Sequence, residues 1–296
     1  MCGIIGLFLK VPDLEPDLGR LTAAMLGTMC ARGPDSAGFA VYSNQRPDIV
    51  KLTLRGPLGT DFDAMSRELS ALCPDLSLAV HDTHAVLSLR ESQETDAREW
   101  LETQAPQIEI VGRGRRMELF KEVGSPDTVA ERFGLSRMRG THAIGHTRMA
   151  TESAVTTDGA HPYSTGTDQC LVHNGSLSNH NSVRRVLMRE GMVFETENDT
   201  EVAAGYLTWR MRQGLSLGEA LQQSLKDLDG FYTFVVGTEN GFGVLRDGIA
   251  CKPAIMAETD RYVAFGSEYR ALAGLPDIGE AKVWEPEPAV AYFWER

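Results

Sequence analysis

A thiol stands one residue from the start of the chain, within the run MCGIIG at residues 1–6. If Met1 is removed, Cys2 carries the α-amino group, whose pKa near ~8 leaves a usable fraction unprotonated at neutral pH. That amine can take the thiol proton, so one residue would supply both a nucleophile and its base. The alternative is that Cys2 is a small buried hydrophobe in a first strand, as free cysteines often are.

Four polar clusters follow at the ends of expected elements or in loops, where a rigid scaffold usually presents catalytic groups. They are RGPDS at 32–36, GHTRMAT at 145–151, HNGSLSNH at 173–180 and NDTE at 198–201. Each has an ordinary alternative when it is taken alone. Asn174-Gly175 is typical of a type I′ hairpin turn, and Asn198 with Glu201 is typical of a capped helix start. His146, His173 and His180 are interpreted as structural.

Taken together and in this order, the clusters and the Cys2-Gly3-Ile4 start resemble the class II glutamine amidotransferases, which are N-terminal nucleophile hydrolases. The resemblance implies that Cys2 attacks the side-chain amide of glutamine and forms a thioester. It implies that Asn174 and Gly175 donate the hydrogen bonds that stabilise the oxyanion, Asn174 from its side chain and Gly175 from its backbone.

The resemblance also implies a substrate-binding set made of Arg148, Asp199, Thr151 and Arg32. Arg148 would hold the α-carboxylate of glutamine as a bidentate fork, Asp199 would accept from its α-ammonium, and Arg32 would order the loop beside the nucleophile. An Arg and Asp pair suits a free amino acid, which disfavours a third class, an N-terminal nucleophile acylase that cleaves another amide.

The elements that must position these residues are mixed. Apolar spacing predicts a helix at 17–30, and 37–43 with 49–54 reads as a strand pair around a polar turn. Further strands are expected at 142–147, 169–173, 231–237, 242–246 and 262–266, and helices at 178–190, 198–213 and 216–228. Strands and helices without strict alternation favour antiparallel sheets layered with helices.

We therefore expect an α+β fold, the four-layer αββα sandwich of two antiparallel sheets that N-terminal nucleophile hydrolases have. A single amidotransferase domain is expected over residues 1–296. The region at about 60–140 changes character, with a strand pair at 78–89, a charged helix near 93–103 and a short helix after residues 125–127. It is expected to be an elaborated or inserted segment.

Composition limits the function classes. The 296 residues carry 41 acidic and 29 basic side chains, a formal net charge of −12, so nucleic acid and anionic membranes are poor partners. No apolar run reaches the ~20 residues of a membrane span, and no signal peptide is recognisable, so a cytoplasmic location is expected. The five cysteines form no C-x-x-C pair, so neither metal nor disulfide is expected.

Ammonia needs an acceptor, and the chain carries no phosphate-binding or dinucleotide fingerprint of its own. We expect no cofactor in this chain and a hetero-oligomer with a synthase subunit that consumes ammonia. The architecture resembles the amidotransferase subunit of glutamate-synthase-like assemblies, including N-methylglutamate synthase, which implies FMN in a partner subunit. Two alternatives stay open: a glutaminase that serves another acceptor enzyme, and a catalytically silent regulatory or scaffold subunit that binds glutamine or glutamate.

Overall fold

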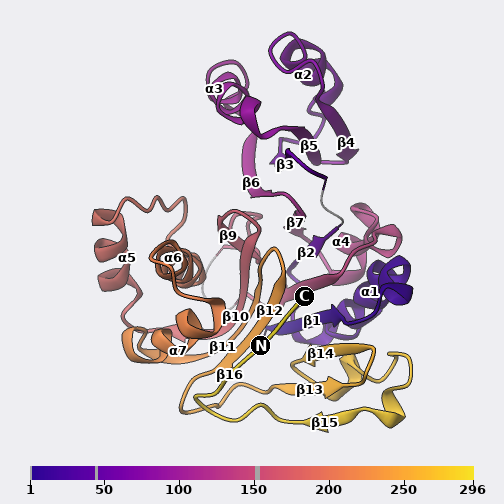
Figure 1. Ribbon diagram of the computed structural model, residues 1–296, viewed down its shortest axis with the longest axis vertical. Helices are drawn as coiled ribbons and strands as arrows, with labels where there is room; N and C mark the ends of the chain where they lie inside the picture. Colours follow the sequence, from indigo (N-terminus) through magenta and orange to yellow (C-terminus); the bar gives the residue numbers. More distant parts are fainter. Residues whose placement is uncertain (1, 44–45, 151–153) are drawn as a thin grey trace.

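The structure is a computed structural model that describes residues 2–43, 46–150 and 154–296. Within these ranges the strands form three sheets, and the strand pairs are antiparallel. Two of the sheets face each other in the body of the molecule, and the third stands apart above them (Figure 1).

The first large sheet has seven strands with β1 near its centre. Its order is β15 (Lys282–Trp284), β13 (Ile255–Glu258), β14 (Tyr262–Gly266), β1 (Gly3–Leu9), β8 (His142–Arg148), β2 (Ser36–Tyr42) and β7 (Met117–Val123). Every residue of β1 is buried. Alternate side chains of a strand point to opposite faces, so Ile5 and Leu7 pack toward one core while Ile4 and Phe8 pack toward another.

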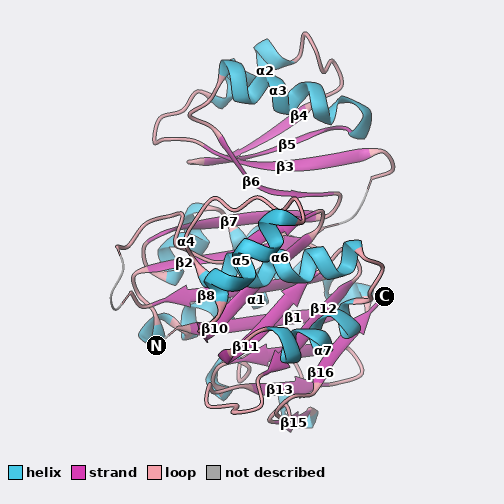
Figure 2. Ribbon diagram, turned by 90° about the vertical axis from the view of Figure 1, so that its left-hand side faces the viewer, coloured by secondary structure: helices cyan, strands magenta, loops and turns pink. Residues whose placement is uncertain are grey.

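The second large sheet has five strands and presents the segment expected to bind substrate. Its order is β16 (Ala291–Glu295), β12 (Gly241–Arg246), β11 (Gly230–Gly237), β10 (Gln169–Leu177) and β9 (Tyr163–Gly166). One face shares a core with the first sheet through Val172, Val235 and Phe242. The other face is covered by helices (Figure 2).

Helices form the two outer layers. Those over the five-stranded sheet are α5 (His180–Arg189), α6 (Asp199–Arg212) and α7 (Leu217–Asp227). Those over the seven-stranded sheet are α1 (Leu18–Thr28) and α4 (Pro126–Arg132). The order helix, sheet, sheet, helix confirms the four-layer sandwich, with a separate apolar core between each pair of layers.

The third sheet belongs to a layer of its own over residues 49–114. Its order is β4 (Ser77–His81), β5 (His84–Arg90), β3 (Ile49–Arg55) and β6 (Glu109–Gly114), and it packs against α2 (Phe62–Leu69) and α3 (Glu94–Gln104). These elements enclose a fourth apolar core that includes Leu52, Leu87 and Leu101. We call this unit the inserted layer.

The expected strand pair at 37–43 and 49–54 is wrong, although both strands exist. β2 pairs with β7 and β8, whereas β3 pairs with β5 and β6 in the other sheet. Tyr42 of β2 lies opposite Met117 of β7, and the Ser43 N–H donates to the Arg116 carbonyl at 2.9 Å. The inserted layer therefore interrupts a β2–β7 hairpin, and its two ends lie side by side.

The other expected elements are present with small shifts of their ends, including the strand pair now seen as β4 and β5. Several elements had not been expected from the sequence, namely α2, β6, β7, β9, β13, β15 and β16. No helix in the described ranges is both long enough and apolar enough to cross a membrane.

Candidate active site

Cys2 lies directly before β1 and is half-buried. Its carbonyl oxygen accepts two side-chain hydrogen bonds, from Arg32 Nε at 2.9 Å and from Asn174 Nδ2 at 3.3 Å. The start of β1 is held as well. The Ile4 N–H donates to Ser267 Oγ at 2.9 Å, and the Ser267 N–H donates back to the Ile4 carbonyl. Segments far apart in the sequence thus fix the backbone that carries the thiol.

Arg32 reaches this position from a short turn after α1 and is only 8% exposed. Its Nη1 pairs with Glu268 Oε1 at 2.6 Å, and Arg270 holds the other carboxylate oxygen at 2.7 Å. The hydrogen bond from Arg32 keeps the pKa of Glu268 below its ordinary value. Because Arg32 is anchored by this ion pair, its Nε is fixed for the Cys2 carbonyl.

Sequence reasoning missed Ser267 and Glu268, which directly follow β14. They belong to none of the four clusters, and no local pattern around them suggests a role. Only the pairing of β14 with β1, in which Gly266 lies opposite Ile5, brings them to the nucleophile's strand.

Asn174 and Gly175 lie inside β10 and do not form a turn, so the hairpin interpretation is wrong. Asn174 lies opposite Thr233 and Gly175 opposite Tyr232 of β11. Asn174 is 4% exposed. Gly175 has a φ of +147°, and a Cβ there would collide with the Phe231 carbonyl oxygen. Glycine is therefore required at this position for the strand to continue.

Arg148 is the last residue of β8 and is half-buried. Its carbonyl accepts from the Asp35 N–H at 3.1 Å, and the Asp35 carboxylate accepts from the Ala150 N–H at 2.8 Å. The loop that carries Arg32 is thus tied to the loop that carries Arg148. Thr151, expected in the substrate-binding set, lies outside the described residues.

Asp199 opens α6, and its carboxylate faces β10. Oδ2 accepts from the Leu177 N–H at 2.9 Å, and Oδ1 lies 3.7 Å from His173 Nδ1. Asn198 is the N-cap, and its side chain accepts from the Thr200 N–H. Glu201 does not complete a capping box, because its carboxylate accepts from the Glu195 and Thr196 N–H groups, both at 2.8 Å.

Three buried histidines pack behind these residues. The rings of His146 and His161 lie 3.9 Å apart, His146 Nε2 contacts the His173 carbonyl, and Thr200 Oγ1 contacts both His161 and His173. Burial lowers the pKa of His146 to about 3 and also lowers the pKa of the other two rings. Burial thus favours the neutral form of all three rings, which suits packing better than proton transfer. His180, by contrast, is only half-buried, and its Nδ1 contacts the Leu177 carbonyl at 2.7 Å.

The arrangement brings a thiol, a buried guanidinium and a side-chain amide donor to one place, with Gly175 next along β10 and Asp199 bound to the same strand two residues further on. Attack on an amide carbonyl and recognition of an amino acid require groups of these kinds. No set of three or more His, Cys, Asp or Glu side chains in the described part of the chain is arranged to hold a metal ion.

Comparison with known proteins agrees with this chemistry. A family model for the glutamine amidotransferase domain matches residues 146–274. The chain is 59% identical over its whole length to the glutamine amidotransferase-like protein GlxB of Rhizobium meliloti, covering 98% of that protein. It is 33% identical to a putative glutamine amidotransferase of Methanothermobacter thermautotrophicus, with 99% of each chain covered.

Among solved structures, the fold matches an allosteric regulatory enzyme of purine biosynthesis with a TM-score of 0.65 at 20% identity. The match covers 99% of this chain and 47% of that one, so the chain spans about half of the solved protein. Relatives that align over their full length, together with this fold, establish the family. The chain belongs to the class II glutamine amidotransferases.

Proposed function

We propose that this chain hydrolyses free glutamine to glutamate and ammonia through a thioester on Cys2 and delivers the ammonia to a partner synthase. The observation that carries the proposal is the pair of hydrogen bonds that Arg32 and Asn174 donate to the Cys2 carbonyl oxygen. Cys2 lies directly before β1 and is contacted by a buried cation and an amide donor. A cysteine that served only to fill the core would not require these two contacts.

In the proposed reaction the Cys2 sulfur attacks the side-chain amide carbon, and the α-amine takes the thiol proton. The C–N bond of the tetrahedral intermediate breaks, and that proton leaves with ammonia. Water then attacks the thioester carbon, which releases glutamate and restores the thiol. Asn174 Nδ2 and the Gly175 N–H would stabilise the oxyanion of both intermediates.

Selection of free glutamine is assigned to Arg148 and Asp199. Arg148 would bind the α-carboxylate, and Asp199 would accept from the α-ammonium while its Oδ2 stays fixed by the Leu177 N–H. Arg32 is assigned a positioning role because its Nε and Nη1 are already committed to Cys2 and Glu268. Thr151 keeps its proposed place in the substrate-binding set.

The decisive test is covalent. The protein is incubated with a diazoketone analogue of glutamine, and intact mass followed by peptide mapping locates the adduct. We expect Met1 to be absent and the adduct to lie on Cys2. Glutamine hydrolysis that survives Cys2→Ala would refute the nucleophile. A retained Met1 with reversible glutamine binding and no adduct would favour the silent regulatory or scaffold subunit.

The partner is proposed to be a glutamate-synthase-like enzyme that carries FMN, of the kind found in N-methylglutamate synthase assemblies. We place its docking surface on the inserted layer, within the segment expected at about 60–140 and its flank. Large apolar side chains are exposed there, with Leu58 81%, Leu72 51% and Val80 48% exposed. A bound partner would cover these side chains and remove their apolar surface from water, which supports the placement.

Copurification from the native host tests the partner. A flavoprotein that elutes with the chain would support the proposal, and a phosphosugar or nucleotide enzyme in its place would indicate another acceptor. Leu58→Glu with Leu72→Glu should weaken the complex while glutamine hydrolysis continues. Val186→Glu, on exposed α5, is the matched control and should leave the complex intact.

A further inference from the structure

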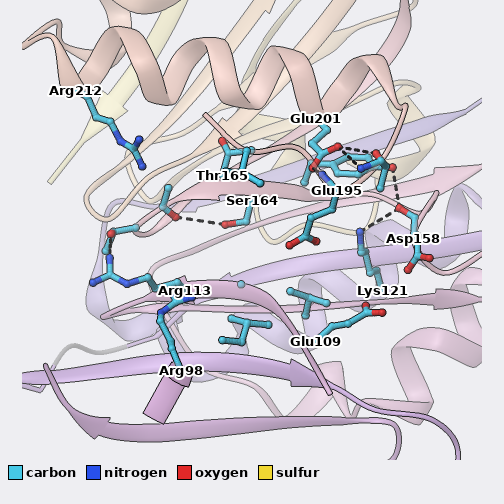
Figure 3. Close-up of a pocket in the computed structure, with 18 residues that line it drawn as sticks. Arg98, Glu109, Arg113, Lys121, Asp158, Ser164, Thr165, Glu195, Glu201 and Arg212 are labelled. Atoms are coloured by element: carbon cyan, nitrogen blue, oxygen red, sulfur yellow. Dashed lines mark hydrogen bonds between the residues drawn. The ribbon is translucent and has the colours of Figure 1, made fainter. Parts of the chain in front are cut away.

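A cavity of about 610 Å³ lies between the inserted layer and the main body (Figure 3). It is bounded by β6, by β9 and by the segment that leads into α6. None of the residues assigned above to the nucleophile, the oxyanion or the two ends of glutamine lines it. Its volume is that of pockets that hold small molecules.

The charges in this cavity are separated. Figure 3 shows the arginine side chains toward one end and the carboxylates with one lysine toward the other. The basic end holds Arg98, Arg113 and Arg212, and the acidic end holds Glu109, Asp158, Glu195, Glu201 and Lys121.

The basic end keeps an excess of positive charge. Glu94 is its neutralising partner and is shared, since it accepts from Arg98 Nε at 2.8 Å and from Arg113 Nη2 at 2.6 Å. Arg212 contacts Met192 Sδ at 3.3 Å, and no carboxylate among the described residues lies within ion-pair distance of it. Three guanidiniums therefore face one carboxylate.

The acidic end has the opposite excess. Arg55 pairs with Asp158 at 2.6 Å and with Glu109 at 3.2 Å. Glu201 is held by the backbone N–H groups of residues 195 and 196. Four carboxylates thus face two cations, Arg55 and Lys121. The Glu195 carboxylate points into the cavity, and burial together with Glu201 raises its pKa.

Lys121 is the second sign that the cavity is built for a ligand. It is 7% exposed, yet no carboxylate among the described residues lies within ion-pair distance of its Nζ. Its contacts are the ring of Tyr163, at 4.5 Å from the centroid, and the Asp158 carbonyl at 3.4 Å. Burial lowers its pKa to about 8. A buried lysine that lacks a carboxylate partner is costly unless something else completes its shell.

We propose that this cavity binds a second small zwitterion, an acidic α-amino acid. Its side-chain carboxylate lies toward Arg98, Arg113 and Arg212, its α-carboxylate lies toward Lys121, and its ammonium lies toward Glu195 and Asp158. A simple anion would satisfy the basic end and leave the acidic end uncompensated, and a simple amine would do the reverse. The inference stands independently of glutamine hydrolysis, because it uses none of the residues of that site.

The test is isothermal titration of the full-length protein with L-glutamate in an Arg148→Ala background, which disables the candidate glutamine site. We expect one bound glutamate per chain. Arg212→Gln and Glu195→Gln should each weaken binding by at least tenfold, the loss expected for one charged hydrogen bond. Glutarate lacks the ammonium, so it should bind to the Arg148→Ala protein at least tenfold more weakly than glutamate does. Adding Glu195→Gln to that protein should leave the affinity for glutarate unchanged.

Arg20→Gln is the matched control, because Arg20 is an exposed arginine whose partner is the surface residue Asp17. It should bind glutamate like the parent. If Arg148→Ala fails to fold, the wild-type chain is titrated instead, and Arg212→Gln should remove one of two bound glutamates. Glutamate binding that is absent, or that both cavity variants leave unchanged, would overturn the proposal.

Discussion

Replacing Asn174 with alanine separates a catalytic role from a structural one. In the structure Asn174 Nδ2 donates to the Cys2 carbonyl at 3.3 Å, a long hydrogen bond between neutral groups. If anchoring were its whole purpose, its loss would cost about 1 kcal/mol of stability. A defect of that size carried into the transition state corresponds to roughly fivefold in rate.

An oxyanion donor has a much larger effect on rate. Loss of one such donor typically lowers kcat by ~10²- to 10³-fold, or about 2.7–4 kcal/mol of transition-state stabilisation. Because the oxyanion forms only after attack, KM for glutamine should change little. We therefore expect Asn174→Ala to lower kcat at least a hundredfold with KM within about threefold.

The assay measures glutamate formation over a range of glutamine concentrations, with the partner synthase added where the free chain is slow. Asn179→Ala is the matched control. Asn179 also makes two structural hydrogen bonds, to the Asp227 carbonyl at 2.9 Å and from the Asp229 N–H at 3.0 Å. It should lose stability and keep its kcat. A folded Asn174→Ala protein with kcat reduced less than tenfold would refute the oxyanion role.

Three further predictions concern stability, measured by urea unfolding. Gly175→Ala should cost about 1–3 kcal/mol or more, because its φ of +147° and the nearby Phe231 carbonyl exclude a Cβ; wild-type stability would contradict this. Glu268→Gln should cost about 1–3 kcal/mol by leaving buried Arg32 without a counter-charge, against at most about 1 kcal/mol for Arg270→Gln, and equal losses would count against the ion pair. Burial lowers the pKa of His84, His142 and His146 from 6.5 to about 3 in the folded chain. As the pH falls below 6.5, the unfolded chain therefore binds protons at these rings before the folded chain does. Stability should be full above pH 6.5 and fall toward pH 3 by about 1.4 kcal/mol per pH unit for each ring, and equal unfolding midpoints at pH 7.5 and 5.0 would exclude this linkage.

Local signals in the sequence placed most elements correctly. The periodic apolar residues of α1 and the Ser125 cap of α4, whose side chain accepts from the Thr128 N–H, act within one or two helical turns. The four polar clusters were likewise readable because each is contiguous. These clusters carried the resemblance to the family, and the family fold predicted the four-layer sandwich because it fixes how the two sheets face each other.

Pairing between distant strands could not be read in the same way. Both faces of β2 are buried, so its residues carry no alternation that distinguishes a hairpin with β3 from a ladder with β7. Asn174-Gly175 misled for a related reason, since the dipeptide usually closes a hairpin but here Gly175 continues a strand. Glu268 acquires its role only through the contact of β14 with β1.

The inserted layer has a consequence for the order of folding. Strand β7 can join β2 only when residues 43 and 116 meet, and the hydrogen bond between Ser43 and Arg116 shows that they do. Closing a disordered loop of this length costs chain entropy, whereas a layer already folded on its own core holds both ends together. The topology therefore favours early formation of β3 to β6 and late addition of β7 at the sheet edge. Pulse-labelled hydrogen exchange should show protection of β5 amides before β7 amides, and the opposite order would refute it.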